Sequence, residues 1–128
     1  MLTVEELRLD KEAVASAYSV LRTMQLIFNS EKNFSTKVKY SAKRLAKRVG
    51  LVSQVVSWLL RKLADAGLLS VEKRGRQLTF YLEKESLLAT LFEKATSQHI
   101  LLLALGLVEL PPEHLRRLVS LLVNSQDN

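Results

Sequence analysis

The sequence predicts a mainly helical α+β fold that contains one small β-hairpin, and three observations carry this prediction. Apolar residues recur at helical spacing over most of the 128 residues. Two strand-like segments flank Arg74-Gly75-Arg76, as in a hairpin with glycine at its tip. A short and a longer helical segment precede that hairpin and are separated by Gly50. We divide the chain into an N-terminal, a central and a C-terminal segment, residues 1–35, 36–82 and 83–128.

The N-terminal segment is predicted to form one long helix, followed by a loop from about Ser30. Thr3 and Glu6 have the spacing of a capping box, and Asp10 is a second possible N-cap. The helix has two apolar faces, and the core of a small domain covers one of them. We therefore expect a second partner, such as another subunit, on the other face. The faces consist of Val14, Tyr18, Leu21 and Phe28 and of Val20, Met24 and Ile27.

A strand and a short helix are predicted at the start of the central segment. Lysines alternate with apolar residues over 36–40, which is typical of a half-buried strand. Ser41 can cap a helix over 42–49 that has one apolar stripe. Gly50 ends this helix, because glycine readily takes the left-handed conformation found after a helix. Four basic residues lie opposite the apolar stripe: Lys43, Arg44, Lys47 and Arg48.

A longer helix is predicted over about 52–66, and the hairpin follows it. Gly67 ends this helix, and the two hairpin strands are expected over 68–73 and 77–82. Helical spacing separates a buried side of the helix from an outward side. The outward side carries Ser53, Gln54, Ser57, Trp58 and Arg61.

The C-terminal segment is predicted to hold three helices, over 84–94, over 97–107 and from Pro111-Pro112 onward. The stretch 97–123 is too apolar to face water on every side. A small domain has little room to hide it, so we expect oligomerisation rather than complete burial within one chain. Together with the two-faced N-terminal helix, this stretch favours a homodimer built by the terminal helices.

Basic residues are concentrated in the middle of the chain. The formal net charge of the whole chain is +6, but residues 37–76 alone contain eleven basic and two acidic residues. The segments on either side of this region are weakly acidic. A local basic surface is typical of proteins that bind a polyanion such as DNA.

The composition argues against an enzyme, a metal protein and a membrane protein. The chain has no cysteine, and His99 and His114 are isolated from other ligand residues. It contains no nucleophile elbow and no phosphate-binding glycine loop. The longest apolar run, 100–108, is about half the length needed to cross a bilayer, and the first residues lack a signal-peptide pattern. We expect a cytoplasmic, nucleoid-associated protein without enzymatic activity, metal ion or cofactor.

The residues of the central segment resemble a known superfamily. The stretch SAKRLAKRVGLVSQVVSWLLRKLADAGLLSVEKRGRQLTFYL is similar to the winged helix-turn-helix of MarR-like and ArsR-like prokaryotic transcription regulators. The matching pieces are LAKRVG for the first helix and turn, VSQVVSWLLRKL for the recognition helix, AGLL for its exit and VEKRGRQLTFYL for the wing. The resemblance covers roughly 36–82 and implies a winged helix-turn-helix with N- and C-terminal helical extensions.

The resemblance also implies which residues contact DNA. The recognition helix, about 52–66, would enter the major groove, and the basic wing, 73–77, would touch the backbone or the minor groove. Trp58 departs from the family pattern, which often has a polar or basic residue there, so DNA contact and packing both stay open for it. The implied contacts are Lys43, Arg44 and Lys47 in the first helix, Ser53, Gln54, Ser57, Trp58 and Arg61 in the recognition helix, and Lys73, Arg74 and Arg76 in the wing.

The sequence therefore predicts a homodimeric transcription regulator, a repressor, that binds double-stranded DNA. Only Gln54 and Arg61 on the outward side have the reach for paired hydrogen bonds to a base. A sequence-tolerant architectural or partition-type DNA-binding protein is therefore an alternative. A winged-helix adaptor that binds protein through Val55 and Trp58 is another, because a fold alone does not define a function. The sequence identifies neither a small-molecule effector nor a target DNA sequence.

Overall fold

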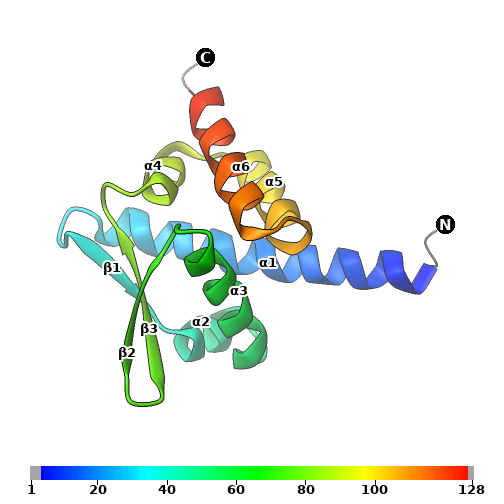
Figure 1. Ribbon diagram of the computed structural model, residues 1–128, viewed down its shortest axis with the longest axis horizontal. Coiled ribbons are helices and arrows are strands. Elements are labelled where there is room, and N and C mark those ends of the chain that lie inside the picture. Colours follow the sequence, from blue (N-terminus) through cyan, green and yellow to red (C-terminus); the bar gives the residue numbers. More distant parts are fainter. Residues whose placement is uncertain (1–3, 127–128) are drawn as a thin grey trace.

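The computed structural model describes residues 4–126, which form helices and one small antiparallel sheet (Figure 1). The predicted class, mainly helical with a small β component, is confirmed. No helix within this range is both long and apolar enough to pass through a membrane. In chain order the elements are α1 (Val4–Glu31), β1 (Lys37–Tyr40), α2 (Ala42–Val49), α3 (Ser53–Asp65), β2 (Ser70–Arg74), β3 (Gln77–Glu83), α4 (Leu87–Lys94), α5 (Ser97–Glu109) and α6 (Pro112–Ser125).

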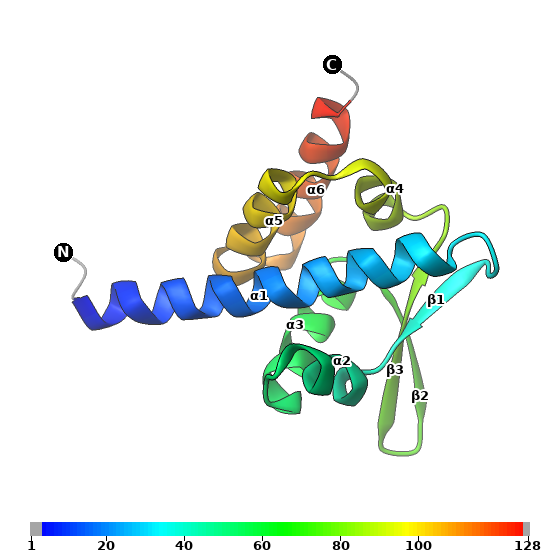
Figure 2. The same cartoon turned by 180° about the vertical axis from the view of Figure 1, so that it is seen from behind.

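Helix α1 is the central element of the fold. Figures 1 and 2 show α2, α3 and the β2–β3 hairpin on one side of it and α4, α5 and α6 on the other. Elements of the same chain cover both apolar faces of this helix, so the second cover that its two faces need is present within the chain. The α1 side chains that are completely buried in this way are Ala17, Val20, Leu21, Met24 and Phe28.

Side chains of α1 also bind the C-terminal end of α4, where a helix leaves its last carbonyl groups without partners of its own. The side-chain amide of Gln25 donates to the carbonyl oxygens of Phe92 at 3.0 Å and Ala95 at 2.9 Å. The side-chain amide of Asn29 donates to the same Phe92 oxygen at 3.1 Å. The rings of Phe28 and Phe92 pack with their centroids 6.4 Å apart. These contacts join the N-terminal helix to residues far along the chain.

The sheet positions the hairpin beside the helices. Its strand order is β1-β3-β2, and both strand pairs are antiparallel. In β1, Val38 and Tyr40 are buried, and the Tyr40 hydroxyl donates to the carbonyl oxygen of Met24 at 2.7 Å. Burial raises the pKa of Tyr40, so its hydroxyl keeps the proton that it donates. Strands β2 and β3 are joined at Gly75, whose φ of +62° suits a tight hairpin turn.

Helices α2 and α3 have the boundaries, within one residue, that their flanking residues predict. Before α2, the hydroxyl oxygen of Ser41 accepts a hydrogen bond from the backbone N–H of Arg44 at 3.4 Å. Gly50 and Gly67 follow α2 and α3 with a φ of +74°. Helix α6 holds the end of α3, because the Nη1 group of Arg116 donates to the carbonyl oxygen of Gly67 at 2.9 Å.

Two helices begin at other positions than the sequence indicates. Helix α1 is continuous through Asp10, so the alternative cap at that residue was wrong; Thr3, the other predicted cap, lies outside the described residues. Helix α4 begins at Leu87 rather than near residue 84. The hydroxyl oxygen of Ser86 accepts a hydrogen bond from the backbone N–H of Ala89, which fixes the later start.

Helices α5 and α6 lie close together on the far side of α1 from the hairpin. Gly106 permits this approach, because a Cβ atom at that position would collide with the side chain of Leu118. The inner side of α5 is completely buried against α1 and α6. Its outer side nevertheless exposes three leucines, Leu101, Leu102 and Leu105.

Candidate nucleic-acid interface

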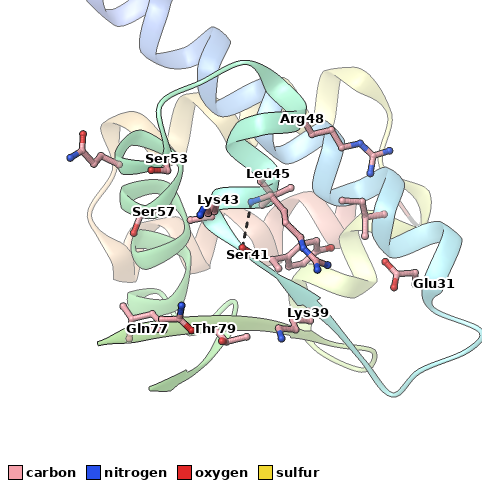
Figure 3. A pocket seen from close by; sticks show the side chains of 16 residues that line it. Glu31, Lys39, Ser41, Lys43, Leu45, Arg48, Ser53, Ser57, Gln77 and Thr79 are labelled. Atoms are coloured by element: carbon pink, nitrogen blue, oxygen red, sulfur yellow. Dashed lines mark hydrogen bonds between the residues drawn. The ribbon is translucent and has the colours of Figure 1, made fainter. Parts of the chain in front are cut away.

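An open groove of about 790 Å³ lies between the end of α1, α2, the first half of α3 and the strands β1 and β3. Figure 3 shows Ser53 and Ser57 of α3 at one side of it and Gln77 and Thr79 of β3 at another, with Lys43 beside the serines and Lys39 beyond Thr79. We call this hollow the basic groove. Its polar and charged lining residues are Glu31, Lys39, Ser41, Lys43, Arg44, Arg48, Ser53, Gln54, Ser57, Gln77 and Thr79.

Helix α2 places two of its three predicted contact residues in the basic groove. Lys43 and Arg44 line it, whereas Lys47 is exposed outside it. Arg48 lines the groove although it was not among the predicted contacts. It stands four residues after Arg44, and residues at that spacing share one side of a helix. The spacing was therefore available in the sequence as a signal.

Strands β1 and β3 contribute further groove residues that sequence reasoning missed. Lys39 is exposed between the buried residues Val38 and Tyr40, so the alternation of the strand turns it outward. Gln77 and Thr79 stand two residues apart and lie on one side of β3 for the same reason. Their contribution depends on how the hairpin folds back beside α3, which local sequence patterns do not indicate.

Helix α3 divides its predicted contact residues between two hollows. Ser53, Gln54 and Ser57 line the basic groove. Arg61, one turn further on, lines a smaller hollow of about 240 Å³ between α3 and the hairpin. The helix therefore presents a continuous polar side toward the hairpin, beginning at its N-terminal turn.

Trp58 lies in neither of these hollows, and the residue is 51% exposed. The Nζ group of Lys62 lies 5.3 Å from the centre of the Trp58 ring and donates to the carbonyl oxygen of Val108 in α5 at 3.4 Å. Burial lowers the pKa of Lys62, and the nearby carboxylate of Glu109 acts in the opposite direction. Trp58 is thus on the α5 side of α3, in contact with Lys62 and open to solvent.

The hairpin carries the remaining predicted contacts at its tip, which projects away from the helices (Figure 1). Lys73, Arg74 and Arg76 are exposed. The Nε group of Arg74 lies 3.3 Å from a carboxylate oxygen of Glu72. The Arg74 side chain is largely open to water and that of Glu72 is partly so, so this ion pair contributes little to stability and Arg74 can exchange it for another anion.

The charges of the basic groove are not balanced by ion pairs. Four of its lining residues are basic and one, Glu31, is acidic. Within the part of the chain that the structure describes, the Arg74–Glu72 pair is the one salt bridge, and it lies outside the groove. Clustered like charges repel each other and attract a ligand of opposite charge. The groove is therefore chemically suited to a polyanion.

Neither histidine belongs to this interface. The Nδ1 atom of His99 accepts a hydrogen bond from the backbone N–H of Thr96 at 3.1 Å, as part of a capping box at the start of α5. His114 is exposed on α6. Among the residues described, no three histidine or acidic side chains are grouped so that they could hold a metal ion.

Comparison with known proteins adds no relative from which a function can be transferred. No match to this chain is found among protein-family models, curated proteins or solved structures. The resemblance to winged-helix regulators therefore stays a prediction. The interface rests on its own geometry and charge.

Proposed function

We propose that this protein is a winged helix-turn-helix DNA-binding protein that regulates transcription as a homodimer. The observation that carries the proposal is the basic groove, where four cations face a hollow without forming ion pairs among the described side chains. The phosphates of a nucleic acid backbone supply the missing charge. The order strand, helix, helix, hairpin also supports the proposal, since it is the order of elements in that motif.

In this proposal α3 is the recognition helix. An α-helix with its side chains is about 10–12 Å across and fits the major groove of B-DNA, which is about 12 Å wide. Gln54 and Arg61 then reach base edges, and the basic groove beside them holds the phosphates of one strand. The hairpin acts as the wing, and Arg74 and Arg76 reach the next phosphates or the minor groove.

Salt-dependent binding tests this proposal. The purified protein is expected to bind mixed-sequence duplex DNA, with an affinity that falls steeply as salt increases, because bound cationic side chains release counterions. If about six basic side chains contact phosphates, the slope of log affinity against log salt is near −5. Fluorescence anisotropy measures this slope. Absence of binding at low salt would remove the proposal.

Selection of bound sites from random duplexes then separates a regulator from an architectural protein. A regulator enriches one sequence, and a twofold dimer enriches two half-sites about one helical turn apart. An architectural protein retains the salt dependence but enriches no sequence. This second result would keep the DNA-binding function and reject transcription regulation.

The proposed dimer has support in the outer side of α5. Leu101, Leu102 and Leu105 are 45%, 48% and 42% exposed. The stretch 97–108 contains no acidic residue, lysine or arginine, so nothing charged interrupts this surface. The N-terminal end of α1 projects beyond the rest of the fold (Figures 1 and 2), where a second copy can lie along it. A second copy that covers both features accounts for them together.

Replacing Leu101 and Leu105 by glutamate is expected to convert the dimer into a monomer that remains folded. Four carboxylates would be brought together across a twofold interface, whereas in the monomer these side chains already face water. Light scattering at micromolar concentration measures the mass. Val71→Glu is the matched control, because Val71 is 50% exposed on β2, away from α5. A wild-type protein that is already monomeric would contradict the proposed dimer.

A further inference from the structure

The solvent-exposed side of α3 has an apolar edge beside its polar residues. Val52 and Val55 are 61% and 42% exposed, and we call these two residues the valine edge. Val55 follows directly on Gln54, which lines the basic groove. The two valines stand three residues apart at the start of the helix, so they lie about one helical turn from each other.

The valine edge does not contribute to the hydrophobic core. Neither side chain belongs to the buried cluster or to the partly buried residues packed against it. Val52 stands at the N-cap of α3, where serine, threonine or aspartate would bind the first N–H groups, and it makes no such hydrogen bond. Valine is also a weak helix former at an exposed position. Both positions therefore hold residues that local stability does not favour.

The charge around the valine edge indicates what covers it. Neither valine lines the basic groove, but Ser53 and Gln54, which stand between them in the chain, do. A ligand that covers the start of α3 therefore also meets the cations of the groove, so it is an anion that carries apolar groups. The major groove of DNA has that composition. The base edges exposed there carry one apolar group, the 5-methyl group of thymine, and phosphates line both sides of the groove.

We propose that the valine edge contacts thymine methyl groups while Gln54 makes paired hydrogen bonds to adenine, so that the protein prefers A·T pairs under the first turn of α3. Glutamine matches the N6 and N7 atoms of adenine, and the thymine methyl lies on the same major-groove side of the base pair. This inference rests on the proposed function, because it requires α3 to enter the major groove.

Duplexes that differ in the methyl group alone test the inference. The probes are alternating d(A-T) and alternating d(A-U) duplexes of about 24 base pairs, compared at one salt concentration. Uracil keeps the base pairing and the phosphates and removes the 5-methyl group. The wild-type protein is expected to bind the uracil duplex about fourfold more weakly for each methyl contact, which is the value of one buried methyl group.

Val55→Ala is expected to bind the d(A-T) duplex more weakly and to reduce the difference between the two duplexes, because the side chain that meets the methyl group is shortened. Leu121→Ala is the control, since Leu121 is also exposed, at 60%, but lies on α6 and lines neither hollow. It should retain the full difference. If Val55→Ala leaves the difference in affinity between the thymine and uracil duplexes unchanged, the role of Val55 is overturned.

Two other results separate this inference from the function on which it rests. Equal wild-type affinity for the thymine and uracil duplexes overturns the inference but leaves salt-dependent DNA binding in place. No binding to either duplex at low salt overturns both.

Discussion

Phe28→Ala is expected to lower the free energy of unfolding by about 3–5 kcal/mol. Phe28 is completely buried in α1, and its ring lies 6.4 Å from that of Phe92 in α4. Alanine would leave a cavity at the place where the N-terminal helix meets the C-terminal helices. Urea denaturation at a fixed protein concentration measures the change.

Leu26→Ala is the matched control for this experiment. Leu26 lies in the same helix but is 58% exposed, so its replacement is expected to change the free energy of unfolding by about 0.5 kcal/mol or less. Equal effects of the two substitutions would mean that the contact between α1 and α4 is not part of the core in solution.

Replacing Lys43, Arg44 and Arg48 together by glutamine is expected to weaken DNA binding on the order of 1,000-fold at low salt. Counterion release contributes about one factor of ten for each phosphate contact at that ionic strength. The slope of log affinity against log salt should become about three units less steep. All three side chains are exposed, so circular dichroism should show an unchanged fold.

A charge-matched control shows whether this loss belongs to the basic groove. Lys84, Lys94 and Arg117 are also exposed, and none of them lines the groove. Their joint replacement by glutamine removes the same charge and is expected to change the affinity by less than about tenfold, since only long-range attraction is lost. If the control loses as much affinity as the groove variant, the phosphates do not bind at the groove.

The elements around the interface could be predicted because short-range signals specify them. Ser41 marks the start of α2 through a side-chain hydrogen bond, and Gly50 marks its end through a left-handed turn. Gly75 specifies the hairpin turn through its left-handed conformation. Each of these signals acts within a few residues, so it can be recognised without knowledge of the rest of the fold.

The surroundings of α1 could not be predicted, because apolar spacing shows that a face is buried but not what buries it. One of the two apolar faces was expected to need a second partner, and residues of both faces, such as Leu21 and Met24, are completely buried within the chain. The position of Trp58 was open for the same reason. Its neighbour Lys62 is held by Val108 in α5, which no local pattern indicates.

The candidate site was predictable where it depends on one helix and incomplete where it depends on several elements. Lys43 and Arg44 were correctly placed on one side of α2 by its periodicity, and Arg48 follows from the same rule. Gln77 and Thr79 enter the groove because β3 folds back beside α3. That arrangement follows from pairing across the sheet rather than from the residues themselves.

During synthesis, α1 is completed long before the C-terminal helices that cover one side of it. The hydrogen bond from Gln25 to Phe92 joins residues 67 positions apart, and ribosomes add about 5–20 residues per second. Synthesis of α4 therefore follows that of α1 by roughly 3–13 seconds, and synthesis of α5 follows later still. Until then Val20, Leu21 and Phe28 are open to chaperones and to other nascent chains. Contacts between such distant residues also slow the folding of the finished chain, because a long loop must close before the core can form.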